Sequence, residues 1–124
     1  MSGRIILATI AVLTFALISV GYAPAPIARG GADGLPVGKW TVEFANKVVE
    51  ECEIRQDGSA KVAEPKRTSE GKAVAKDGAV VIVFDDDRVE RWTPVGQRFV
   101  VEHWCPAAQY PAGTPVLGIA DRSR

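Results

Sequence analysis

Three strand-like runs joined by two short turns occupy residues 79–104, which read AVVIVFDDDRVERWTPVGQRFVVEHW. Ala79 to Phe84 is a continuous apolar run, typical of a central strand that is covered on both faces. Asp85-Asp86-Asp87 ends it abruptly, and Val89 to Thr93 and Arg98 to Trp104 follow, with a short turn between them. Apolar runs of this length separated by turn residues predict neighbouring antiparallel strands.

The same pattern extends towards the N-terminus. Trp40, Val42 and Phe44 alternate with polar residues, which predicts a half-buried strand. Further strands are expected at Val48–Arg55, Ser59–Ala63 and Lys72–Lys76. In the first of these, Val48, Cys52 and Ile54 share one side, whereas Val49 and Glu50 break the pattern. Asp57-Gly58 and Asp77-Gly78 favour tight hairpin turns, and a polar loop is expected over Pro65–Gly71.

These runs predict an all-β domain built as a single antiparallel meander of about seven strands, either a small barrel or a sandwich. After Cys105 the chain contains Pro106, Pro111 and Pro115 with two glycines, a composition that disfavours helix and ladder pairing. We therefore expect a Pro/Gly-rich C-terminal strap that lies over the sheet and closes one end of the core, followed by a solvated tail at 122–124.

The N-terminus has the pattern of an export signal. Arg4 precedes an apolar run from Ile5 to Val20 that carries no charge on any face. We interpret residues 1–28 as a signal peptide or uncleaved anchor, 29–36 as a flexible Ala/Pro/Gly-rich tether, and 37–124 as the β domain. An uncleaved helix with Arg4 inside also leaves the domain outside the cytoplasm. The predicted location is extracytoplasmic, either periplasmic or secreted.

Two cysteines, Cys52 and Cys105, lie in the domain. In an oxidising compartment they form one intramolecular pair, so we predict a disulfide between them. Subtracting the two positions gives a loop of 53 residues, whose closure contributes up to about 4 kcal/mol by restricting the unfolded chain. The alternative is a pair of buried free thiols packed as small hydrophobic groups.

The charge balance excludes one class of partner. The chain has 15 basic and 15 acidic residues and is 47% hydrophobic. Nucleic-acid-binding domains usually carry a basic excess, so we expect no nucleic-acid partner. The membrane is contacted only through the N-terminal segment, if that segment is uncleaved.

The opening of the first strand, Gly38-Lys39-Trp40, has the G-x-W pattern of lipocalin-like, or calycin, barrels and resembles that family. The resemblance implies that Trp40 plugs the closed end of a barrel and that a late arginine, Arg98 or Arg122, packs across it. It also implies a small apolar ligand in the opposite mouth. The family's barrel has eight strands, one more than the pattern here predicts.

An immunoglobulin-like sandwich is the rival fold, since the cysteine spacing suits its inter-sheet bridge. That fold needs a tryptophan soon after the first cysteine and a tyrosine two residues before the second. The chain has no tryptophan between Cys52 and Trp92, and His103 occupies the tyrosine position.

Catalytic motifs are sparse. His103, the only histidine, shares a strand face with Cys105, but oxidation of that sulfur removes the nucleophile. An enzyme is the third interpretation, and it requires an activity that is lost when His103 or Glu102 is replaced. Asp85, Asp86 and Asp87 with Glu90 carry oxygen ligands suited to calcium, although a solvated turn is the commoner role. We expect no catalytic residue, no cofactor and no metal ion.

The aromatic residues Trp40, Trp92, Trp104 and Tyr110 form a candidate ligand or interaction surface, with Trp92 the most exposed of the tryptophans. Packing in the core is the commoner role for such rings. The sequence therefore predicts a non-catalytic exported β domain that acts as a binding or interaction module. It does not identify the partner, for which an envelope protein and a small apolar ligand are the two candidates. A lipocalin-like carrier of a small apolar ligand is the alternative.

Overall fold

The computed structural model describes residues 34–124. The predicted signal segment and residues 29–33 of the expected tether lie outside the described residues. Within residues 34–124, no helix has the length and apolar character needed to cross a membrane.

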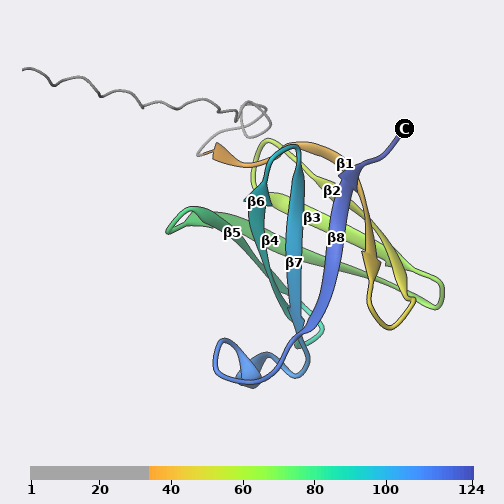
Figure 1. The fold of residues 1–124 in the computed structure, drawn as a ribbon, viewed down its shortest axis with the longest axis vertical. Coiled ribbons are helices and arrows are strands. Elements are labelled where there is room, and N and C mark those ends of the chain that lie inside the picture. The colour runs from red at the N-terminus through yellow and green to blue at the C-terminus, as the bar shows by residue number, and fades with distance from the viewer. Residues whose placement is uncertain (1–33) are drawn as a thin grey trace, which may run out of the picture.

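Eight antiparallel strands close into a barrel in which each strand pairs with its neighbours in sequence and the last pairs with the first (Figure 1). The strands are β1 (Gly38–Phe44), β2 (Val49–Ile54), β3 (Ser59–Glu64), β4 (Arg67–Lys76), β5 (Ala79–Phe84), β6 (Val89–Val95), β7 (Arg98–Trp104) and β8 (Val116–Arg122). The all-β antiparallel meander is therefore confirmed, with one strand more than expected. Short hairpins link β1 to β7, as the turn residues indicate.

Two sequence expectations are corrected. The polar loop expected over 65–71 is mostly strand, because β4 starts at Arg67 and pairs along β3 as far as Lys72. The C-terminal strap is wrong beyond residue 115, where Val116–Arg122 forms β8. This strand pairs with β1 through Trp40–Phe44 and with β7 through Phe99–His103. The edges of β1 and β7 thus supply hydrogen-bonding partners to a segment whose own composition does not favour a strand.

Side chains fill the barrel interior. Trp40, Trp92 and Phe99 meet across the upper half, with ring centroids 5.2 to 5.9 Å apart. The first two are 0% exposed and Phe99 is 2% exposed. An eight-stranded barrel is about wide enough for its inward side chains to fill it, and here they contact one another across the axis.

The upper end in Figure 1, which carries the C-terminus and the β6–β7 turn, is closed by the start of the domain. Leu35 is 3% exposed and belongs to the core. The carbonyl of Pro36 accepts a hydrogen bond from Trp40 Nε1 at 2.8 Å. Residues 35 and 36 therefore contact the barrel.

Residues 105–115, the C-terminal loop, lie at the lower end (Figure 1) and include a short 3₁₀ turn, η4 (Ala107–Gln109). The loop packs on the outward-facing Trp104, which is 2% exposed. Tyr110 lies edge-on to that indole at 4.9 Å, and Trp104 Nε1 donates to the Gly113 carbonyl. This part of the strap covers the outer surface as expected.

Candidate functional site

A cluster of polar side chains lies inside the lower half of the barrel. Glu50 comes from β2, Glu90 from β6 and His103 from β7, and we call these three the carboxylate–histidine cluster. One ligand atom from each lies within 4.8 Å of the others. All three occupy inward positions of the period-two alternation, which places them inside the barrel.

Glu50 is the least satisfied member of the cluster. Its side chain is 0% exposed, and neither carboxylate oxygen has a hydrogen-bond partner among the described residues. Burial, followed by the nearby negative charge of Glu90, raises the pKa of Glu50 to about 10. Without a bound cation, the carboxyl is therefore protonated at neutral pH.

Glu90 and His103 are tied together. Oε2 of Glu90 lies 2.9 Å from Nδ1 of His103, and Oε1 accepts a hydrogen bond from Trp92 Nε1 at 3.0 Å. Phe44 lies edge-on to the imidazole at 5.5 Å. Glu90 is 0% exposed, whereas the side chain of His103 retains 13% exposure. The histidine is thus the member that reaches towards solvent.

A second group, the arginine network, lies beside this cluster and consists of Arg88, Glu64, Ser69 and Asp86. The Arg88 side chain is 0% exposed, and it donates to Glu64 at 3.1 Å, Asp86 at 3.0 Å and Ser69 at 2.6 Å. Burial alone lowers the pKa of Arg88, but these partners outweigh it and raise that pKa above its usual value. The hydrogen bonds of Arg88 therefore hold Glu64 and Asp86 but not Glu50.

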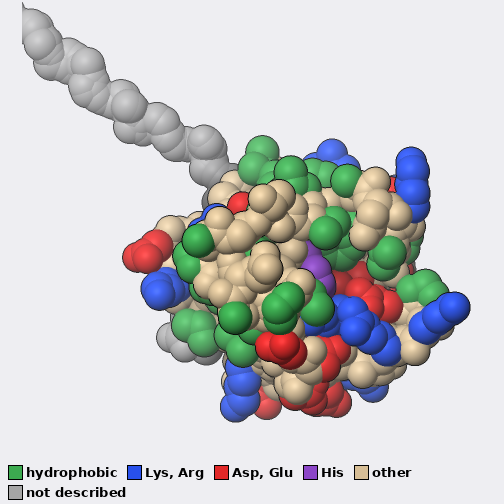
Figure 2. All heavy atoms as spheres, turned by 90° about the horizontal axis from the view of Figure 1, so that it is seen from below, with side chains coloured by type: hydrophobic (Ala, Val, Ile, Leu, Met, Phe, Trp, Pro, Cys, Tyr) green, Lys and Arg blue, Asp and Glu red, His purple; other side chains and the backbone are tan. Residues whose placement is uncertain are grey.

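The lower end has a small opening next to the carboxylate–histidine cluster. A depression of about 140 Å³ is lined by Phe44, Asn46, Val48, Glu64, Arg67, His103 and Val116. Figure 2 views the molecule from this end, and the histidine side chain is visible there beside acidic and basic groups. A small ion can reach His103 from solvent by this route.

Trp40 at the upper end has the neighbour that the lipocalin resemblance implies. The guanidinium carbon of Arg122 lies 4.5 Å from the centre of the Trp40 ring, and Arg122 Nη1 donates to the Val37 carbonyl. Arg98 instead forms a two-point ion pair with Asp121. Arg122 therefore ends β8 and packs on Trp40. It is exposed, as is Arg124, which agrees with the solvated tail expected at 122–124.

The structure places the other aromatic candidates mainly in the core. Trp40 and Trp92 are each 0% exposed and Trp104 is 2% exposed, so the expected exposure of Trp92 is wrong. Trp92 shares its face with Arg88 and Glu90. All three side chains are 0% exposed, so that face is the inside of the barrel. Tyr110 keeps intermediate exposure over Trp104.

The predicted disulfide is wrong, because both cysteines are free in the structure. Cys52 points into the barrel from β2, whereas Cys105 is exposed just after β7. Burial, together with Glu90 and Glu50, raises the pKa of the Cys52 thiol. The alternative of two buried thiols holds for Cys52 alone.

The other candidate groups do not converge on a site. His103 turns to Glu90 inside the barrel, while Cys105 is exposed. The three aspartates of the β5–β6 turn have separate partners: Asp85 accepts from the Glu70 amide, Asp86 contacts Arg88, and Asp87 accepts from the Ala107 amide. Glu102 forms an ion pair with Arg91 on the outer surface at 2.8 Å.

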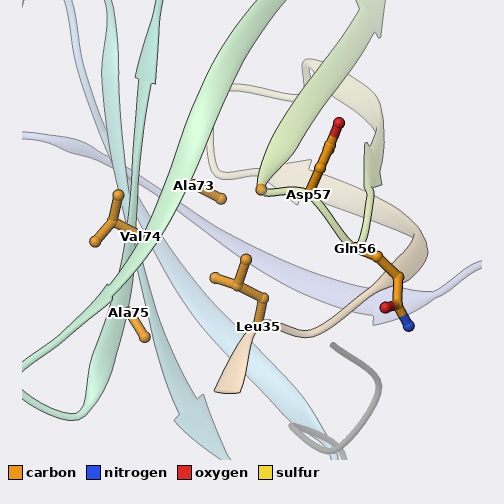
Figure 3. Close-up of a pocket in the computed structure, with 7 residues that line it drawn as sticks. Leu35, Gln56, Asp57, Ala73, Val74 and Ala75 are labelled. Carbon is orange, nitrogen blue, oxygen red and sulfur yellow. The ribbon is translucent and has the colours of Figure 1, made fainter. Parts of the chain in front are cut away.

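The outer surface of β4 and β5 carries an uncovered apolar strip. Val74, Val81 and Val83, here called the valine stripe, point outward, and Val74 pairs with Val81 across the two strands. Val74 is 59% exposed and Val83 is 54% exposed. In Figure 3 the Val74 side chain points away from Leu35 and from Ala73, its inward-facing neighbour. The expectation that Ala79–Phe84 is covered on both faces is therefore wrong.

An open cleft beside β4 has a volume of about 500 Å³, and Figure 3 shows the residues that line it. It lies between Leu35, the β2–β3 turn at residues 56–58, and the β4 residues 73–75. The Leu35 side chain extends towards β4 across the cleft. The cleft brings together no cluster of charged or metal-ligating groups among its lining residues.

The buried polar groups were not identified from the sequence, although a signal was present. Glu50 is two residues from Cys52 and four from Ile54, so strict alternation places it inside; it was interpreted as a break in the pattern. Arg88 and Glu90 likewise share the phase of Trp92. A charged residue in the inward phase of a strand is therefore the signal that could have found this site.

Comparison of the chain with models of protein families, with curated proteins and with solved structures found no significant match.

Proposed function

We propose that this protein is an exported, non-catalytic interaction module that binds an envelope protein through the valine stripe. The observation that carries the proposal is the exposure of two valines on paired strands, Val74 on β4 at 59% and Val83 on β5 at 54%, beside the outward residues of β5, which are all apolar. Burying a valine side chain is worth about 1.5 kcal/mol or more, so a partner that covers the stripe gains affinity from it. The export signal expected over residues 1–28 supports the location.

The closed barrel restricts how a partner is bound. Every strand pairs on both sides, so the barrel offers no open edge to which a partner strand can add. Binding must therefore use side chains on the outer face. Lys72 and Lys76 flank Val74 on β4, and both are exposed. The complementary partner surface has an apolar centre and an acidic rim.

Capture of partners by the wild-type protein and by Val83→Asp tests this proposal. Val95→Asp is the matched control, because Val95 is 58% exposed but lies at the end of β6, outside the stripe. We expect the same protein partner with wild type and with the control, and at least about tenfold less with Val83→Asp, as for a central interface residue. Equal capture by both variants would contradict the proposal.

A lipocalin-like carrier of a small apolar ligand is the second candidate. The packing of Arg122 on Trp40 favours it. The side chains that fill the interior count against it, since Trp40, Val42, Ile82, Trp92 and Val101 are each 0% exposed. Mass spectrometry of the protein purified under mild conditions separates the two: a stoichiometric bound lipid supports the carrier, and a protein companion without lipid supports the interaction module.

A further inference from the structure

We propose that Glu50, Glu90 and His103 bind one divalent transition-metal ion of the zinc class inside the lower end of the barrel. This site is separate from the valine stripe and does not depend on it. It was not expected from the sequence, which favoured no metal ion.

The first argument is the unpartnered carboxylate. Glu50 is fully buried, and neither of its oxygens has a hydrogen-bond partner among residues 34–124. Buried polar groups are normally satisfied, and an exception calls for a bound ion, an ordered water or a functional role. Glu50 lies next to a second carboxylate and an imidazole, both of which are metal ligands. A cation bound among the three supplies the partner that Glu50 lacks.

The second argument is the local charge. The carboxylate–histidine cluster and the arginine network together hold four carboxylates, those of Glu50, Glu64, Asp86 and Glu90. The guanidiniums beside them are Arg88, which is buried, and Arg67, which contacts Glu64 at 2.8 Å and Asp86 at 4.0 Å. The arginines pair with Glu64 and Asp86, so Glu50 and Glu90 are the two of these carboxylates without a guanidinium partner, and a divalent ion that displaces the proton of Glu50 balances their two charges.

The third argument is the type and number of ligands. One imidazole nitrogen and two carboxylate oxygens suit zinc and its neighbours, whereas magnesium and calcium prefer oxygen alone. Tetrahedral zinc with bonds of about 2.0–2.1 Å holds its ligand atoms about 3.4 Å apart. The ligand atoms here lie within 4.8 Å of one another, so small side-chain rotations bring them into range. Three protein ligands leave a fourth position of a tetrahedral ion for water.

The second shell is already in place. Trp92 Nε1 donates to Oε1 of Glu90 and fixes the orientation of that carboxylate, leaving Oε2 directed at His103. Phe44 packs edge-on against the imidazole. Groups of this kind hold ligands in position in metal sites.

The test is titration of the untagged, chelator-treated full chain with Zn²⁺ by calorimetry and with Co²⁺ by visible absorption. The variants are Glu50→Gln and His103→Gln, and Glu53→Gln is the control on the outward-facing side of β2. Circular dichroism checks that each variant is folded. We expect one ion per chain, a tetrahedral cobalt spectrum for wild type and for Glu53→Gln, and at least about 100-fold weaker binding for both ligand variants.

Glu50→Gln replaces a buried carboxyl by an amide of similar size, and weaker metal binding cannot be attributed to unfolding if the variant remains as stable as wild type. The proposal is overturned if wild type binds no ion at a one-to-one ratio, if Ca²⁺ binds in preference to Zn²⁺, or if Glu50→Gln binds Zn²⁺ as tightly as wild type. These readouts do not involve the valine stripe, so they stand or fall independently of the proposed function.

Discussion

Glu50 carries a carboxyl group that folding removes from water without providing a hydrogen-bond donor. An unpaired buried charge is costly, and the group avoids that cost by taking up a proton. The pKa of about 10 in the folded state lies above the usual value of 4.5. Between these two values the folded protein holds a proton that the unfolded chain releases, so the metal-free protein loses stability as pH rises.

In the presence of a chelator, the free energy of unfolding of wild type should fall between pH 5 and pH 8, by up to about 1.4 kcal/mol per pH unit. Glu50→Gln should remove most of this slope and should be the more stable protein at pH 8. Urea unfolding at several pH values measures both effects, with Glu53→Gln as the control. Parallel pH profiles for wild type and Glu50→Gln would show that Glu50 is not the group responsible.

The two cysteines differ in how deeply they are buried. Cys105 is exposed, while Cys52 faces the barrel interior with a raised thiol pKa. A thiol reagent should therefore modify one cysteine per folded chain rapidly and the second only after denaturation, because the reactive form is the exposed thiolate. Mass spectrometry identifies the modified residue. Native protein that shows no reactive thiol until it is reduced would contradict this expectation.

At the scale of elements, the strands were predictable where a local signal was strong. Ala79–Phe84 and Arg98–Trp104 match β5 and β7 residue for residue, because apolar runs and turn residues bound them on both sides. β8 was missed, since its sequence follows three prolines and its pairing depends on β1 and β7. Propensity is a weak guide where neighbouring strands supply the partner.

The site was less predictable than the strands, because it depends on which face of each strand is inside. Glu50 and Glu90 lie at inward positions, where a charged residue is disfavoured. Their place there becomes clear only when the closed barrel brings the two side chains together. Trp92 was expected to be exposed for the same reason: its face carries Arg88 and Glu90. A local pattern indicates alternation but not which side is buried when both sides carry polar residues.

The C-terminal loop is held to the barrel mainly by Trp104. Replacing Trp104 with Ala should cost about 3–5 kcal/mol if the site does not collapse, and it should also release residues 105–115. Limited proteolysis should then cut that loop much faster than in wild type, whereas Val95→Asp should leave the rate unchanged. Unaltered cleavage in Trp104→Ala would mean that other contacts hold the loop.

At the scale of the whole molecule, the two ends of the barrel differ in polarity, and one part of the outer surface carries an uncovered apolar strip. The upper end is apolar and closed by Leu35, Trp40 and Arg122, and the lower end is polar and holds the carboxylate–histidine cluster. Since the interior is filled, a macromolecular partner has access only to the outer surface. The valine stripe is the part of that surface where the apolar run of β5 stays uncovered.

The most direct test of this account is site-specific photo-crosslinking in cells that produce the full chain. A photoreactive amino acid is placed in turn at Val74, Val83, Val95 and Glu43, all of which are exposed. The account predicts one discrete protein adduct from Val74 and Val83, absent from Val95 and Glu43. Adducts of equal yield from all four positions, or adducts to lipid alone, would contradict it.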